Sequence, residues 1–441
     1  MTGGQLSAAA RAVFQAGAWS RDQIQDYQSS RLRALARHAW RRVPFYRRQM
    51  ESAGLHWSDV GGLESLARFP VIDRTAIRET PPGDLLAQGL DATALAVHHT
   101  SGTSGQPLAV RRTAFEERLL HMFRLRVMFG YGMRWRDRRV SVRSSNASER
   151  AWWVKLGLIE QHTIATREGP DALRARLLQL RPEVVEGYAT TLADIGDRLS
   201  SAERKTLHPR FVAAGAEPLT PDRRRRIAEG FQARVYDVYG SEEFNLIAAE
   251  CLQTGLLHLC ETSLIAEVLC DGRPARPGET GQLVATALHS YAMPFLRWRL
   301  GDRVRKGPEP CPCGAPFATL EEVQGREEDV FWLPGGRNLR PYWLVVPLMQ
   351  RFPWVRQYQL VQERPDLVRL LVVAAPEVTD APERLSGWRR DAEEHCGAPV
   401  RVVVEQVAQI PLEPSGKFRS IRSRLPAGIE GCRRDARNRL S

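Results

Sequence analysis

Lysine is nearly missing from this chain of 441 residues: only four of its 63 basic side chains are lysine, and the rest are arginine. Arginine takes places where any surface cation would serve, so the formal net charge of +12 reflects composition more than a designed patch. The densest arginine run, 223–226, has no aromatic residues interleaved with it. This composition argues against a specific nucleic-acid partner and favours small anionic ligands.

Long apolar runs are also missing, and none approaches the roughly 20 residues that span a bilayer. The N-terminal residues lack the compact apolar segment of a signal peptide. The seven cysteines are spaced irregularly, which is not the pattern of a disulfide framework. We therefore expect a cytoplasmic protein with no membrane partner.

The chain has the length of a large domain followed by a smaller one. Apolar residues at helical spacing over 31–53, interrupted at Pro44, predict a helical cap within about residues 1–80. Short apolar strands then alternate with helices, the rhythm of an α/β core. The predicted helices are 113–128, with Thr113 and Glu116 as a capping box, and 171–180, 191–199 and 221–229.

From about residue 256 the pattern becomes rich in strands, which predicts a β-rich subdomain up to about 325. After the turn-dense residues 307–316 the chain restarts as a compact α+β unit. Its expected strands are 355–362, 367–374 and 400–405, with a helix over 381–395. We expect an N-terminal α/β domain over 1–327 and a small, mobile C-terminal α+β domain over 328–441.

A loop rich in hydroxyl groups and glycine, TSGTSGQP, begins at Thr100. Its backbone N–H groups and hydroxyls can bind phosphate oxygens. A Walker loop would have lysine after its second constrained glycine, but Gln106 stands there and the Walker spacing is absent. Taken alone, the loop fits either a phosphate site or a structural turn.

Five further fragments follow this loop: GAEPLT, DVYGSEEF, RWRLGDR, GREED and LEPSGKFR, which begin at residues 215, 237, 297, 325 and 412. We predict each of them on a loop. In this order they resemble the core motifs of the adenylate-forming superfamily. RVPFYRR at 42–48, GAEP, and CPCG at 311–314 narrow the resemblance to the phenylacetate–CoA ligase branch, which includes coenzyme F390 synthetase-like and capsular-polysaccharide-cluster proteins.

The resemblance implies a reaction in two steps. A carboxylic acid, expected to be aryl or arylacetic, reacts with ATP in the presence of Mg²⁺ to give an acyl adenylate and pyrophosphate. A thiol, expected to be coenzyme A, then accepts the acyl group. Transfer to an amine, binding of nucleotide without turnover, and a homodimer all stay open.

The family motifs also imply residue roles. Lys417 would stabilise the adenylation transition state, because a compact ammonium enters a crowded site where a guanidinium does not. Glu243 would bind Mg²⁺, Arg326 would reach the nucleotide, and Glu328 would be the hinge between the domains. Glu242 stands where the family usually has serine or threonine.

The remaining roles concern the nucleotide and the acid. Asp302 would accept hydrogen bonds from the ribose, and Tyr239 would stack on adenine. The other expected nucleotide-binding residues are Ser101, Gly102, Thr103, Ser104, Gly105, Gly215, Ala216, Glu217, Asp237 and Gly240. The expected acid pocket contains Tyr188, Phe244 and Asn245.

A second group of residues has metal-ligand chemistry. Cys251 and His258 lie close in sequence, and Cys311 and Cys313 follow later. Three thiolates and an imidazole form a closed zinc site, which would stabilise the β-rich subdomain without taking part in catalysis. Cys-x-Cys is a less usual spacing, and His258 would fit equally as a packed strand residue.

Overall fold

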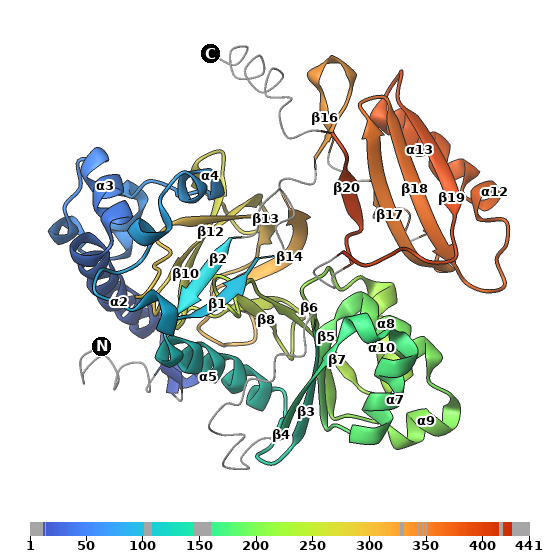
Figure 1. The fold of residues 1–441 in the computed structure, drawn as a ribbon, viewed down its shortest axis with the longest axis horizontal. Coiled ribbons are helices and arrows are strands. Elements are labelled where there is room, and N and C mark those ends of the chain that lie inside the picture. Colours follow the sequence, from blue (N-terminus) through green and yellow to red (C-terminus); the bar gives the residue numbers. More distant parts are fainter. Residues whose placement is uncertain are drawn as a thin grey trace.

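A single twisted sheet of 12 strands forms the backbone of the large N-terminal part of the protein (Figure 1). The computed structural model describes residues 12–13, 15–100, 108–143, 160–326, 330–339, 341, 344–345, 348, 351–413 and 418–425. The strand order in the sheet is β11-β10-β12-β13-β14-β9-β8-β7-β6-β5-β3-β4. None of the described helices is both long and apolar enough to cross a lipid bilayer.

Parallel strands form one half of this sheet, as the alternation of strands and helices predicts. Its interior strands are short apolar runs such as Phe211–Gly215, which is buried throughout. In Figure 1 the helices α7, α8 and α10 cover one face and α5 lies on the other. The elements are β3 (Arg138–Arg143), β4 (Glu160–Ala165), η6 (Thr166–Glu168), α7 (Pro170–Leu180), β5 (Val184–Tyr188), α8 (Ala189–Arg198), α9 (Ser201–Thr206), β6 (Phe211–Gly215), α10 (Pro221–Phe231) and β7 (Arg234–Tyr239).

Antiparallel strands continue the same sheet from β7 onward. The strands of the expected β-rich subdomain are therefore hydrogen-bonded to the α/β half in one continuous order rather than forming a sheet of their own. The elements are β8 (Ala248–Glu250), β9 (Leu257–Leu259), β10 (Leu264–Cys270), β11 (Arg273–Pro274), β12 (Thr280–Ala287), β13 (Trp298–Lys306) and β14 (Thr319–Arg326).

The N-terminal helices pack against this antiparallel half, where Leu32, Phe45 and Trp298 share one buried core. The first long helix begins ten residues before the predicted stretch, because Ser20 caps it and its first turns are too polar to show helical periodicity. Pro44 opens the next helix, as its fixed φ allows. The elements are η1 (Ala16–Ala18), α2 (Arg21–Arg42), α3 (Pro44–Ser52), η2 (Trp57–Asp59), η3 (Leu63–Arg68), α4 (Arg74–Arg78), η4 (Pro82–Leu85) and η5 (Ala92–Ala94).

A separate hairpin of β1 (Ala96–His99) and β2 (Ala109–Arg112) leads into α5 (Ala114–Gly130). The capping box predicted for this helix is confirmed, since Thr113 and Glu116 each bind the other's backbone N–H. The hydroxyl-rich loop joins the two strands, and its residues 101–107 lie outside the described part of the chain.

The C-terminal part has a four-stranded sheet in the order β19-β18-β17-β20 and its own core, which includes Leu360 and Trp388. The three predicted strands are confirmed, whereas the predicted helix is broken at Leu385. The elements are β15 (Phe331–Trp332), η7 (Pro334–Gly336), β16 (Asn338–Leu339), β17 (Val355–Arg364), β18 (Leu367–Ala374), α12 (Ala381–Arg384), α13 (Ser386–Cys396), β19 (Arg401–Gln406) and β20 (Ile421–Ser423). The predicted boundary between 327 and 328 falls on residues outside those described.

Helices α8 and α10 cross at two glycines, and this contact yields a prediction. A Cβ on Gly230 would lie 2.3 Å from the Cα of Gly196, so the two backbones would have to separate. We expect Gly230→Ala to lower the free energy of unfolding by about 1–3 kcal/mol, measured by denaturant titration. Gly387→Ala in α13, where a Cβ meets nothing within 4 Å, is the matched control and should keep full stability. If Gly230→Ala and Gly387→Ala had equal free energies of unfolding, the close backbone contact between α8 and α10 would be contradicted.

Candidate functional site

Three neighbouring parallel strands end side by side at one edge of the sheet. Tyr188, the last residue of β5, is in register with Gly215 at the end of β6, and Gly215 is in register with Val238 of β7. Open α/β sheets bind ligands outside the carboxyl ends of their strands. The GYAT, GAEP and YGSEEF fragments therefore meet at the edge where a ligand is expected.

The GAEP loop leaves β6 through a tightly constrained backbone. A Cβ at Gly215 would lie 2.2 Å from the carbonyl oxygen of Val238, so only glycine fits there. Ala216 has a φ of +62°, a left-handed conformation that is uncommon for a residue with a side chain. These two residues turn Glu217 so that its carboxylate accepts the backbone N–H of Thr190 at 2.9 Å and that of Phe418 at 2.8 Å.

Tyr239, Asp302 and Arg326 form a connected group at the same edge. The Tyr239 hydroxyl donates to Asp302 Oδ2 at 2.5 Å, and Arg326 Nε lies 3.3 Å from Asp302 Oδ1. The prediction of loops is wrong here, because Asp302 lies inside β13 and is only 7% exposed, and Arg326 is the last residue of β14. Burial raises the pKa of Asp302, which Arg326 opposes. Burial and the nearby Asp302 raise the pKa of Tyr239 well above its usual value.

Glu243 reaches the site from a tight turn. A Cβ on Gly240 would lie 2.0 Å from the carbonyl oxygen of Asn245, and Asn245 itself has a φ of +63°. The turn buries the Glu243 carboxylate, whose negative charge helps to raise the pKa of Asp302. Mg²⁺ in proteins takes one or two carboxylates together with substrate phosphates. Glu243 fits that requirement.

Two arginines at the site belong to none of the sequence motifs. Arg74, the first residue of α4, places Nη2 3.7 Å from Glu243 Oε1, and both side chains are nearly buried. Arg112 at the end of β2 donates to the carbonyl of Glu242 and pairs with Glu117 at 3.0 Å. Arg112 thus ties the hairpin that carries the hydroxyl-rich loop to the loop that carries Glu243.

Other predicted residues lie apart from this group. Asp237 is grouped instead with Glu250, whose carboxylate accepts the Asp237 backbone N–H and pairs with Arg224. Phe244 is buried in the core against Phe295, which does not favour a place in the acid pocket. Ser101, Gly102, Thr103, Ser104, Gly105, Glu328 and Lys417 lie outside the described residues.

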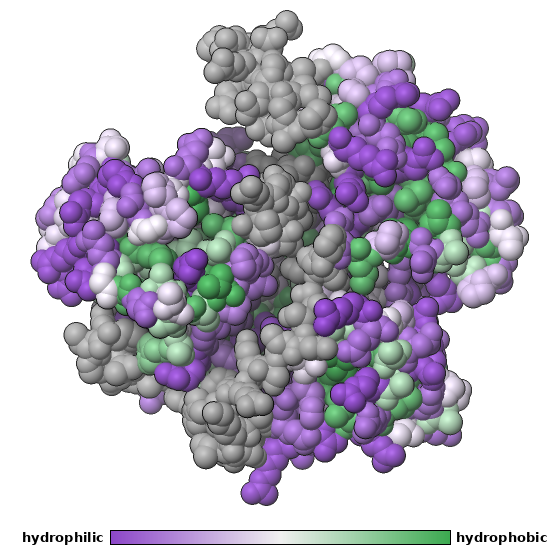
Figure 2. Space-filling view, viewed as in Figure 1, coloured by the Kyte–Doolittle hydropathy of each residue, from purple (hydrophilic) through white to green (hydrophobic). Residues whose placement is uncertain are grey.

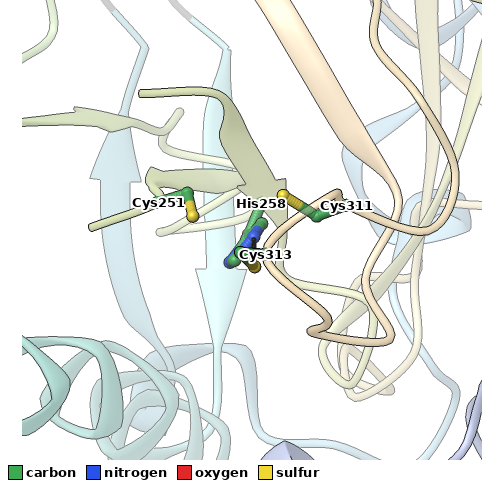
Figure 3. A group of neighbouring side chains, drawn as sticks. All are labelled: Cys251, His258, Cys311 and Cys313. Atoms are coloured by element: carbon green, nitrogen blue, oxygen red, sulfur yellow. Dashed lines mark hydrogen bonds between the residues drawn. The ribbon is translucent and has the colours of Figure 1, made fainter. Parts of the chain in front are cut away.

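The four predicted metal ligands come together. Cys251 follows β8, His258 lies in β9, and Cys311 and Cys313 lie in the turn before β14 (Figure 3). Their ligand atoms all lie within 4.8 Å of one another, and Cys313 Sγ is 3.4 Å from His258 Nε2. Three thiols and one imidazole at this separation have the chemistry and spacing of a tetrahedral zinc site.

Comparison with known proteins agrees with the fold. A family model described as the CapK C-terminal domain matches residues 345–424. A phenylacetate–coenzyme A ligase of Thermus thermophilus is 28% identical over 438 residues, which cover 91% of this chain and 96% of that protein.

Two solved structures of 2-hydroxyisobutyryl-CoA ligase each cover 98% of this chain and 94% of their own. The structure in the postadenylation state has a TM-score of 0.76 at 22% identity, and that in the thioesterification state has 0.63 at 23%. The fold is thus that of the adenylate-forming ligases. In sequence, the chain is similar to the phenylacetate–coenzyme A ligases, and a second one, from Escherichia coli, is 26% identical over 71% of this chain and 74% of that protein.

The environment of Asp237 gives a prediction about pH. Burial, together with the nearby Glu250, raises the pKa of Asp237 to about 7. The unfolded chain ionises this carboxyl near its ordinary pKa of about 3.9, so folding stability is lost as the pH rises from there through the folded pKa. We expect Asp237→Asn to become increasingly more stable than the original chain between about pH 4 and 7, measured by thermal unfolding.

Asp26→Asn is the control, because Asp26 is an exposed residue on α2. Between about pH 4 and 7, the stability of Asp26→Asn relative to the original chain should stay constant. A constant difference between the Asp237 variant and the original chain at every pH would contradict the raised pKa.

Proposed function

We propose that this protein is an ATP-dependent, AMP-forming ligase that activates a carboxylic acid as an acyl adenylate and transfers the acyl group to coenzyme A. The observation that carries the proposal is the hydrogen bond from the backbone N–H of Phe418 to Glu217. It brings the residue directly after Lys417 to the sheet edge that holds Tyr239, Asp302 and Glu243. The guanidinium of Arg223 lies over the Phe418 ring at 5.8 Å and supports the same docking.

The chemistry follows from these positions. A carboxylate oxygen of the acid attacks the α-phosphorus of ATP, and the bond to the pyrophosphate oxygen breaks. The Lys417 ammonium offsets the negative charge that builds up on the phosphate and carboxylate oxygens. Asp302 orients the ribose and Arg326 lies at the nucleotide. Mg²⁺ held by Glu243 would neutralise charge on the phosphates.

In the second step the sulfur of coenzyme A attacks the acyl carbonyl carbon, AMP leaves, and the thiol loses its proton. The pose of the small domain suits the first step. Its Arg356 and Gln357 contact Asp197 and Asp194 of α8, and the carbonyl of Arg356 accepts from Arg226 of α10 at 3.0 Å. The higher TM-score with the postadenylation structure supports this assignment. A swing about Glu328 would then admit coenzyme A.

The expected substrate is an aryl or arylacetic acid, as the names of the curated relatives suggest. Tyr188, which is 8% exposed at the end of β5, and the turn at Asn245 are the described residues that we assign to its pocket.

We also propose that Cys251, His258, Cys311 and Cys313 bind one structural Zn²⁺. Four protein ligands leave no open position for substrate, so the metal would stabilise the fold rather than act as a Lewis acid. A cytoplasmic setting, in which thiols stay reduced, suits such a site.

The ligase proposal is tested by exchange of labelled pyrophosphate into ATP over a panel of carboxylic acids. Lys417→Ala should lower the exchange rate by at least 100-fold while the chain stays folded, because the transition-state charge loses its cation. Lys205→Ala, an exposed lysine on α9, is the matched control and should exchange normally. If any acid supports pyrophosphate exchange equally well in Lys417→Ala and Lys205→Ala, the role of Lys417 is refuted.

Product analysis with the active acid then separates the acceptors. Coenzyme A is expected to yield a thioester. Formation of an amide from an added amine, with no thioester, would overturn the second half of the proposal. No exchange with any acid would favour a protein that binds nucleotide without turnover.

The metal proposal predicts one equivalent of zinc per chain, measured by elemental analysis of protein purified without chelators. Cys313→Ser should lose the metal and unfold at a lower temperature, because the site contributes directly to folding. Cys270→Ser, at a cysteine outside the cluster, should keep both metal and stability. Original protein without zinc would contradict the assignment.

A further inference from the structure

A cavity of about 340 Å³ lies between the C-terminal half of α5 and the segment that joins β8 to β9. Arg126 and Val127 of α5 and Tyr131, directly after the helix, line one side of it, and Leu252, Leu259 and Phe317 line the other. Three of the proposed zinc ligands also form part of its wall. The cavity shares no residue with the Tyr239–Asp302–Arg326 group.

Arg126 is the unusual feature of this cavity, because none of the described carboxylates forms an ion pair with it. Its Nη1 donates to the carbonyl of Ala12 at 2.9 Å and to the hydroxyl of Thr262 at 3.2 Å. The rings of Phe123 and Phe317 lie 5.9 and 5.8 Å from its guanidinium carbon. Burial lowers the pKa of Arg126. Its partners among the described residues are thus neutral.

Two acidic residues lie at the cavity: Glu250 lines it, and Glu261 follows the lining residue Cys260. Both carboxylates have partners other than Arg126. The Glu250 carboxylate binds Arg224 and the backbone N–H of Asp237. The Glu261 carboxylate binds Arg21 and the backbone N–H of Ala318. Neither serves as the counter-ion of Arg126. The Arg126 guanidinium is partly buried at the cavity wall. Since burial disfavours a charge that has no opposite charge beside it, an anionic ligand that enters the cavity would offset this cost.

We propose that this cavity is a binding site for a small carboxylic acid with an apolar body, held by its carboxylate on Arg126. A guanidinium presents paired N–H donors in the geometry that a carboxylate accepts. The leucine, valine and aromatic walls suit a compact aromatic or short aliphatic body, and the volume is at the small end for ligand pockets.

The walls are held in place before any ligand binds. The Tyr131 ring stacks on Tyr236 with centroids 4.1 Å apart, and its hydroxyl donates to the carbonyl of Glu250 at 2.9 Å. The cavity lies at the end of α5 opposite to Thr113, so about 20 Å of helix separates Arg126 from the hairpin of the hydroxyl-rich loop. An acid bound here is therefore distinct from the acid that the proposed ligase would activate.

Equilibrium dialysis with labelled benzoate, phenylacetate and hexanoate, without ATP, tests this site. We expect saturable binding to the original chain. Arg126→Gln should lose one equivalent, with at least tenfold weaker binding at that site, while any binding at the reaction centre is kept. Arg176→Gln, at an exposed arginine of α7, is the matched control and should bind as the original chain does.

Arg126→Gln could lose acid binding by misfolding, since Arg126 also binds Ala12 and Thr262. A second variant therefore tests the cavity while it keeps Arg126. Gly130 lines the cavity, and a Cβ there meets nothing within 4 Å, so Gly130→Trp adds bulk at the cavity while Arg126 itself is kept. It should also lose one equivalent of acid. Absence of saturable binding to the original chain, or unchanged binding in both variants, would overturn the proposal. Because no turnover is measured, these results are independent of the proposed ligase reaction.

Discussion

The carboxylate of Glu217 is the contact on which the arrangement of the two parts of the protein depends. One oxygen accepts the N–H of Thr190 in the first turn of α8, and the other accepts the N–H of Phe418 in the C-terminal part. Hydrogen bonds to a charged acceptor are stronger than neutral ones. The Glu217 side chain thus holds Phe418, which lies shortly before β20, at the carboxyl edge of the large sheet. The proposed chemistry needs that loop at this edge, because Lys417 directly precedes Phe418.

The edge itself depends on backbone approaches that leave no room for side chains. Gly215 faces the carbonyl of Val238, and Gly240 faces the carbonyl of Asn245. These contacts turn Glu217 and Glu243 toward the same region, while Tyr239 and Asp302 meet by direct hydrogen bonding. The two glycines belong to the GAEP and YGSEEF fragments, so these fragments supply backbone geometry as well as functional groups.

Local patterns in the sequence predicted much of the fold, because each α/β unit carries its own periodicity and caps. Thr113 and Glu116 illustrate this, since their capping box needs only neighbouring residues. Properties that depend on distant contacts were not predictable. Asp302 was expected on a loop, but pairing between β13 and its neighbours buries it in a strand. Arg74 reaches Glu243 only through packing of the N-terminal helices, and nothing in its local sequence signals that contact.

The four-residue metal cluster also has a place in this geometry. His258 of β9 is in register with Thr319, the first residue of β14, and β14 ends at Arg326, which pairs with Asp302. On the other side, β8 continues the chain from the turn that carries Glu243 and leads to Cys251. The cluster therefore joins the two segments that deliver Glu243 and Arg326 to the site. A metal bound there would restrain both segments at once, and so it would help to position Glu243 and Arg326 without itself contacting the substrate.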